Sequence, residues 1–154
     1  MRLILPQGAV DFDTLGAMLG VFLLEEDTIA LTPERYASRC EPLVAQYAHK
    51  LPFASRLRWR HPDGKHWKLP LWNRMALGLD FLQSLHVAKW LKEKKVQLDP
   101  FYASVILLGI TFTTDRINSF TVDDEIHGVM DYLLTQGADE VFVKRWMKGT
   151  IQLG

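Results

Sequence analysis

Two aspartates near the start of the chain, Asp11 and Asp13, are the residues whose type and spacing most directly suggest chemistry. They lie in segment 8–20, between a short apolar stretch and a pattern of apolar residues with helical spacing. Divalent cations such as Mn²⁺ and Mg²⁺ bind anionic oxygen atoms on a rigid support, so this pair could hold one of these metals. We expect Asp13 to be the N-cap of this helix. The structural alternative to a metal site is that Asp13 only caps the helix and Asp11 stays in solvent. Because Asp13 is expected to cap the helix, Asp11 is the one of the two expected to be free for a ligand.

Segment 56–69 has the strongest local structural pattern, because alternating polar and apolar residues flank a Pro-Asp-Gly turn at 62–64. This pattern predicts a β-hairpin with a short loop. In the expected register one face is apolar and suits packing on a core. The other face is basic and carries Arg56, Arg58, Arg60, His66 and Lys68. His61, Asp63 and His66 are only a weak metal-binding pattern, since the turn explains Asp63 and the strand alternation explains His66.

The charge distribution indicates a positive face. The chain has a net charge of zero, yet Lys and Arg far outnumber Asp and Glu over residues 50–95. Such a face can contact phosphates, so we expect an anionic partner, either nucleic acid or another protein. The residues expected to make this contact are Arg56, Arg58, Arg60, Lys65, His66, Lys68, Lys89 and Lys92. A solvated outer face, or charge complementarity within the domain, are the alternatives.

The remaining patterns predict a small helix-rich α/β domain with a short sheet and the hairpin near residues 56–69, and a mostly α fold is the alternative. Short strands are expected at 2–5 and 28–31. Helices are expected after Asp13, over 32–50 with a kink or split at Pro42, and over 73–95, 99–110, 121–137 and 139–148. A polar break is expected over 111–118. At this length the whole chain, 1–154, is expected to form one domain.

The composition indicates a cytoplasmic protein that does not enter a membrane. Hydrophobic residues make up 48% of the chain, but no run of about 18 apolar residues occurs. The N-terminus also lacks the basic and then apolar pattern of a secretion signal. The single cysteine, Cys40, cannot form an internal disulfide and is expected to be an inert thiol. No pattern in the sequence specifies an oligomeric state.

Segment 10–17, Val-Asp-Phe-Asp-Thr-Leu-Gly-Ala, resembles the first motif of the DHH phosphoesterase superfamily, including the relatives fused to tRNA nucleotidyltransferases. The run 107–111, then Thr121 and Asp124, and then the run 133–139 are similar to the segment that follows the central motif of that family. Together these matches cover about half of the chain. In the family the acidic pair helps to bind catalytic metal. The resemblance therefore implies a Mn²⁺ or Mg²⁺ site with the ligands Asp11, Asp13, Asp63, His66 and Asp115.

Several features depart from the family pattern. Gln7 stands nearest the place where the family usually has a histidine, and no aspartate occurs between Asp27 and Asp63. The Asp-His-His triplet of the family is missing from the chain. The later family motif has an aspartate soon after the residues that match Gly109 and Ile110, but here Thr113 and Thr114 come before the first aspartate, Asp115. With only two well-placed ligands, a second metal would not be held and water activation would be poor.

Two hypotheses follow. In the first, the chain is a shortened, degenerate relative of the DHH fold that has lost hydrolysis and serves as a binding or interaction module for an anionic partner such as nucleic acid. In the second, it is an active metal-dependent phosphoesterase acting on nucleotides or short oligonucleotides. A structural subunit of a larger assembly is a third possibility. The missing motifs favour the first hypothesis.

Overall fold

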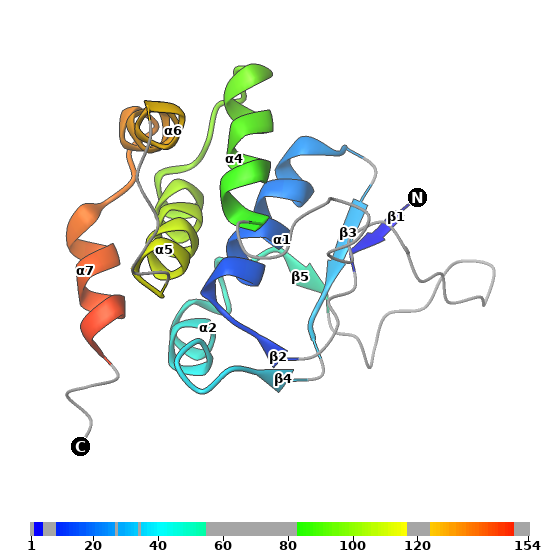
Figure 1. The fold of residues 1–154 in the computed structure, drawn as a ribbon. Helices are drawn as coiled ribbons and strands as arrows, with labels where there is room; N and C mark the ends of the chain where they lie inside the picture. Colours follow the sequence, from blue (N-terminus) through cyan, green and yellow to red (C-terminus); the bar gives the residue numbers. More distant parts are fainter. Residues whose placement is uncertain are drawn as a thin grey trace.

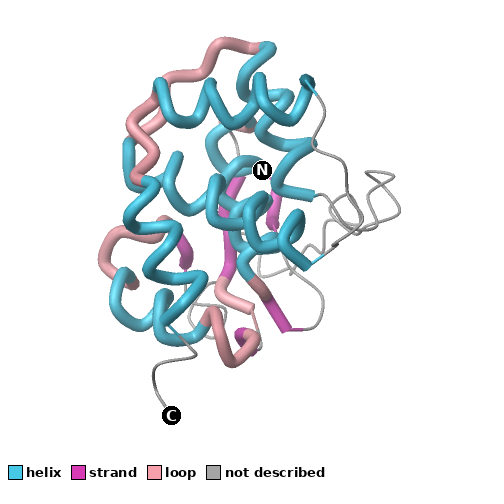
Figure 2. Tube along the Cα trace, turned by 60° about the vertical axis from the view of Figure 1, so that its left-hand side comes forward, coloured by secondary structure: helices cyan, strands magenta, loops and turns pink. Residues whose placement is uncertain are grey.

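The computed structural model describes residues 2–4, 9–26, 28–33, 35–54, 83–116 and 124–149. Helices dominate these ranges and the strands are short, which confirms a small helix-rich α/β fold. Figure 2 shows that helices make up most of the described chain. The predicted hairpin near residues 56–69 lies outside the described ranges, as does the first part of the helix predicted over 73–95.

The larger sheet consists of three parallel strands in the order β1-β3-β5. They are β1 (Arg2–Ile4), β3 (Thr28–Leu31) and β5 (Phe53–Ala54). A second parallel pair joins β2 (Ala9–Val10) to β4 (Arg35–Tyr36). Parallel neighbours need a long crossover connection, and the segment containing helix α1 (Phe12–Leu24) provides one for both sheets. The strand predicted at 28–31 is confirmed, and the one predicted at 2–5 is confirmed over Arg2–Ile4, the part of it that the structure describes.

Helix α1 lies at the centre of the fold, between the larger sheet and two further helices, α4 (Gln83–Glu93) and α5 (Pro100–Arg116) (Figure 1). Its first residue, Phe12, is buried and packs edge-to-face on Phe112 of α5, with ring centroids 5.5 Å apart. Buried side chains surround the helix axis, because neighbours cover α1 on several sides. This explains why its sequence is apolar nearly all round.

Small residues let the three central helices approach closely. A Cβ atom at Gly16 of α1 would lie 2.6 Å from the hydroxyl oxygen of Ser84 and 3.3 Å from the Cα of Ile106. A Cβ atom at Gly109 of α5 would also overlap that hydroxyl, and would lie 2.7 Å from the carbonyl oxygen of Phe12. Side chains larger than glycine therefore do not fit where α1, α4 and α5 cross.

The outer helices are α2 (Glu41–Tyr47), α6 (Asp124–Thr135) and α7 (Glu140–Gly149). Helix α7 packs on α5, and α6 packs on α4 and α5. Tyr47 of α2 contacts the rings of Phe101, Phe142 and Trp146, which ties α2 to α5 and α7. Gly137 has a φ of 99° and ends α6, as predicted.

The helix predicted over 32–50 is wrong in its first half. Residues Arg35–Tyr36 form β4 and pair with β2, and α2 begins only at Glu41. Pro42 then lies in the first turn of α2, where its missing N–H is not needed for an intrahelical hydrogen bond. The proline therefore marks a helix start and not a kink.

The polar break predicted over 111–118 is also wrong in its first part, because α5 continues to Arg116. The hydroxyl of Thr113 donates to the carbonyl of Gly109, and that of Thr114 donates to the carbonyl of Ile110, each at 3.1 Å. Both polar side chains are thus satisfied by the preceding turn of the helix. Across the described ranges, no helix combines the length and the apolar character needed to cross a membrane.

Candidate functional site

Asp11 is the N-cap of helix α1. Its backbone is extended, with φ −96° and ψ −175°, and its Oδ1 accepts a hydrogen bond of 2.8 Å from the backbone N–H of Thr14. Its carbonyl oxygen accepts from the N–H of Leu15 at 2.9 Å, which is the first hydrogen bond of the helix. The prediction that Asp13 is the N-cap is therefore wrong, and Asp11 does not remain in solvent without a structural role.

Asp13 lies inside the first turn of α1 and is only 7% exposed. Its Oδ1 accepts a hydrogen bond of 2.9 Å from the backbone N–H of Ser84, and its carbonyl accepts one of 2.6 Å from the Ser84 hydroxyl. Ser84 is fully buried. The carboxylate of Asp13 thus joins the first turn of α1 to α4, and its negative charge is stabilised by the partial positive charge at the N-terminus of α1.

Ser84 is a site residue that the sequence patterns do not identify. It lies 71 positions after Asp13, in a segment whose local pattern indicates only a helix. A hydrogen bond between residues so far apart produces no repeating pattern in the sequence that could reveal it. The one available signal is the pair of glycines, Gly16 and Gly109, whose missing side chains make room for the Ser84 hydroxyl.

The side chain of Cys40 lies near Asp11, and that of Tyr36 lies near Cys40. Burial raises the pKa of the Cys40 thiol to about 12, and the negative charge of Asp11 adds to this shift. Burial, with a smaller contribution from Cys40, raises the pKa of the Tyr36 hydroxyl to about 12 as well. The Tyr36 hydroxyl is buried and has no hydrogen-bond partner among the described residues. A thiol with this pKa stays protonated at neutral pH, which agrees with an inert Cys40.

The predicted metal ligands are only partly covered by the described ranges. Asp63 and His66 lie outside them, and Asp115 lies in the last turn of α5 with a side chain that is not described. The side chains of Asp11 and Asp13 are described, and both accept hydrogen bonds from backbone N–H groups. Among the side chains that the structure describes, no three of the types His, Cys, Asp and Glu lie together in a way that could hold a metal ion.

The predicted basic surface is covered only at α4. Arg56, Arg58, Arg60, Lys65, His66 and Lys68 lie outside the described ranges. On α4, Lys89 is half-buried and Lys92 is exposed. The ammonium of Lys92 lies over α6, at 2.8 Å from the position that a Cβ atom of Gly128 would take. Lys94 and Lys95, in the turn that follows α4, are also exposed.

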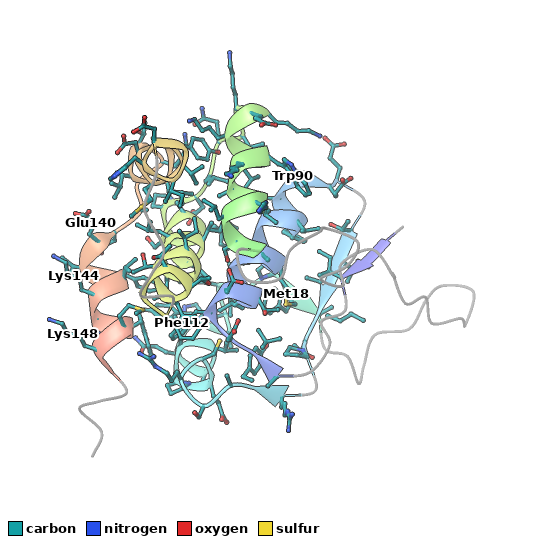
Figure 3. The ribbon with its side chains drawn as sticks, in the orientation of Figure 1. Met18, Trp90, Phe112, Glu140, Lys144 and Lys148 are labelled. Carbon is teal, nitrogen blue, oxygen red and sulfur yellow. The ribbon has the colours of Figure 1, made fainter. Side chains whose placement is uncertain are left out.

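A second basic surface is present on α7. Figure 3 shows the side chains of Lys144 and Lys148 on the side of α7 that faces away from α5. Arg145 is exposed on the same helix, and Val141 beside it is 73% exposed. The charge pattern of the sequence does not single out this surface, because its charges fall outside the basic region at 50–95.

No family model matches the chain, and comparisons with curated proteins and with solved structures find no significant match.

Proposed function

We propose that the chain is a non-catalytic binding module, a degenerate relative of the DHH fold, whose anionic partner is a nucleic acid. One observation carries this proposal: both carboxylates of the acidic pair are hydrogen-bonded to backbone amides. Asp11 holds the first turn of α1 through Thr14, and Asp13 holds Ser84 of α4. The pair therefore stabilises the fold, and this role remains useful to a protein that has lost catalysis.

The local electrostatics also supports a structural role for the pair. The N-terminus of a helix carries partial positive charge, which favours a carboxylate and disfavours an added cation. Asp13 is nearly fully buried, so replacing its hydrogen bond to Ser84 with a metal ligand bond would require the α1–α4 contact to rearrange.

The exposed positive charge supports nucleic acid as the partner. Lys92, Lys94 and Lys95 are exposed at the C-terminal end of α4, and the basic hairpin face is predicted from the same region of the sequence, 50–95. Lysine and arginine side chains that neutralise phosphates release bound counterions, which makes this kind of binding favourable and dependent on salt.

Fluorescence anisotropy with labelled single-stranded and duplex oligonucleotides tests the proposal. The affinity is expected to fall steeply between about 50 and 200 mM salt. Replacing Arg56, Arg58 and Arg60 together with Ala is expected to weaken binding without lowering the melting temperature. The matched control replaces Lys144 and Lys148 of α7, which are exposed but lie outside the proposed surface. Binding that is absent in the unmodified chain, or unchanged in the triple variant, contradicts the proposal.

A Mn²⁺- or Mg²⁺-dependent phosphoesterase is the second candidate. It is favoured by the position of Asp11 and Asp13 directly after β2, since open α/β folds place ligand sites beyond the carboxyl ends of parallel strands. Titration with millimolar Mn²⁺, followed by thermal melting, separates the candidates. A melting temperature that rises in the unmodified chain, but not in Asp11→Asn, supports the enzyme. A melting temperature that stays constant excludes this metal site.

A further inference from the structure

Lys95 has a backbone conformation that lysine rarely adopts. Its φ is +55°, and it is the only non-glycine residue with positive φ in the described part of the chain. The N–H of Val96 donates to the carbonyl of Leu91, and the N–H of Lys95 donates to the carbonyl of Lys92, each at 3.0 Å. These two hydrogen bonds define a Schellman motif that ends α4, with Lys95 at the left-handed C′ position.

Helix α6 ends in the same way but with the residue that this position normally favours. The N–H of Ala138 donates to the carbonyl of Leu133, and the N–H of Gly137 donates to the carbonyl of Leu134, each at 3.0 Å. Gly137 has a φ of 99° and takes the C′ position without a side chain to strain the backbone. The two helices thus share one cap geometry, and only α4 places a Cβ atom in the left-handed region.

The favourable interaction of positive charge with a helix C-terminus does not explain why a lysine occupies the left-handed position 95. Lys92 and Lys94 already supply positive charge to the last turn of α4 in ordinary helical or cap positions. A glycine at 95 would keep both hydrogen bonds of the cap and remove the backbone strain. The strained position therefore indicates a role for the Lys95 side chain outside the fold.

The surroundings of Lys95 fit a phosphate. The four consecutive residues 92–95 are all exposed, and Lys92, Lys94 and Lys95 outweigh the single acid, Glu93. We propose that this turn is a contact site for the phosphate backbone of the nucleic acid, with Lys95 held in the left-handed conformation to direct its ammonium at a phosphate. The inference rests on the proposed function and extends the contact surface beyond Lys89 and Lys92 to the end of α4.

The test uses the full chain and a labelled single-stranded oligonucleotide, with affinities measured by anisotropy over a series of KCl concentrations. Lys95→Asn removes the charge and keeps a residue that tolerates positive φ, and Lys95→Gly removes both charge and strain. Lys148→Asn on α7 is the matched control, since Lys148 is also an exposed lysine at the end of a helix. Poly-glutamate serves as a competitor without phosphate.

Both Lys95 variants are expected to bind about two- to fivefold more weakly at low salt. The plot of log affinity against log salt should become less steep by about one unit, the effect of one lost phosphate contact. Lys95→Gly should at the same time melt about 2–4 °C higher, because the strain is relieved. A Lys95→Gly variant that is more stable yet binds more weakly would show that the loss of affinity is not caused by loss of folding. The Lys148→Asn control should bind like the unmodified chain.

Three results would overturn the inference. If Lys95→Gly melts higher but keeps its affinity and salt dependence, the lysine is merely tolerated in the cap, and the proposed function still stands on the arginine variant. If poly-glutamate displaces the oligonucleotide as effectively as unlabelled oligonucleotide does, the site binds acidic protein. If the unmodified chain shows no salt-dependent binding, the inference and the proposed function fail together.

Discussion

Ser84 donates two hydrogen bonds to Asp13, one from its backbone N–H to the carboxylate at 2.9 Å and one from its hydroxyl to the carbonyl at 2.6 Å. Both residues are buried where α1, α4 and α5 cross. The pair therefore fixes the position of α4 against the first turn of α1. It also explains why a carboxylate can be buried here, since a charged group inside a protein needs hydrogen-bond donors.

Replacing Asp13 with Ala is expected to lower the free energy of unfolding by about 1–3 kcal/mol, because the N–H of Ser84 loses its acceptor in a buried place. Asp13→Asn, which keeps an oxygen at that position, should cost less. Urea unfolding measures both changes. An Asp13→Ala variant as stable as the unmodified chain would show that the α1–α4 contact does not depend on this carboxylate.

Asp11→Ala removes the N-cap of α1 and should lower the free energy of unfolding by about 1 kcal/mol. Asp11→Ser keeps an oxygen that can cap the helix, so it should retain most of that stability.

Alanine at Gly109 is expected to be strongly destabilising. Its Cβ atom would meet the hydroxyl of Ser84 and also the carbonyl oxygen of Phe12 at 2.7 Å, and a backbone atom cannot move without shifting α1. Gly128→Ala in α6 is the matched control, since its Cβ atom would meet only the flexible ammonium of Lys92. That variant should be neutral or gain about 0.5–1 kcal/mol from helix propensity. Equal effects of the two substitutions on the urea midpoint would refute the close crossing.

Alanine at Gly16 provides a rescue experiment. The nearest atom to its Cβ would be the Ser84 hydroxyl oxygen at 2.6 Å, and the next contacts lie at 3.3 and 3.4 Å. Adding Ser84→Ala removes the nearest atom, so the double variant should be about 0.5–3 kcal/mol more stable than the sum of the single effects predicts. The same addition should not rescue Gly109→Ala, where the Phe12 carbonyl remains in place. A double-mutant cycle without coupling at Gly16 would contradict the geometry.

The helices with long apolar patterns could be predicted from the sequence, and the shortest strands could not. The glycine stop at Gly137 and the start of α5 at Pro100 follow from local chemistry. Strands β2, β4 and β5 have two residues each, which is too short for an alternating pattern. Their pairing depends on contacts between distant parts of the chain.

The candidate site could also be predicted only in part from the sequence. The acidic pair stands out in the sequence, but the apolar pattern predicts the cap at Asp13, two residues too late, because Asp11 and Asp13 both precede apolar residues. Packing decides between them: Phe12 is buried against Phe112, and this draws Phe12 into the first helical position. Asp11 then becomes the cap and Asp13 turns inward to Ser84. Neither contact can be read from local spacing.

Stability is expected to fall in alkaline solution. In the unfolded chain the Cys40 thiol has its usual pKa of 9.0, whereas in the folded chain its pKa is about 12. The pKa of the Tyr36 hydroxyl likewise rises from 10.0 in the unfolded chain to about 12 in the folded chain. The unfolded state therefore binds fewer protons in this range, so the free energy of unfolding decreases as pH rises above 9.0. The urea midpoint, measured against pH, should decline less steeply in Cys40→Ala. Rapid alkylation of the native thiol at neutral pH would contradict its burial and its raised pKa.

Arg39 is expected to hold the C-terminal helix against the core. Its guanidinium donates a hydrogen bond of 2.6 Å to the carbonyl of Met147, in the last turn of α7, and lies 5.5 Å from the centroid of the Phe112 ring. Arg39→Ala should lower the free energy of unfolding by about 1.5–3 kcal/mol, since a hydrogen bond from a charged group is lost. It should also increase hydrogen exchange at the amides of α7.

Arg145→Ala is the control for Arg39, because Arg145 also lies over an aromatic ring, 5.8 Å from the centroid of Trp146, but is exposed on the same helix that Arg39 contacts. An exposed cation–π contact should contribute only about 0.5–1 kcal/mol. Faster exchange along α7 in the Arg39 variant, but not in the Arg145 variant, would assign the effect to the bond with the helix C-terminus. Equal exchange in both variants would mean that α7 is held by its packing on α5 and α2 and not by the Arg39 hydrogen bond.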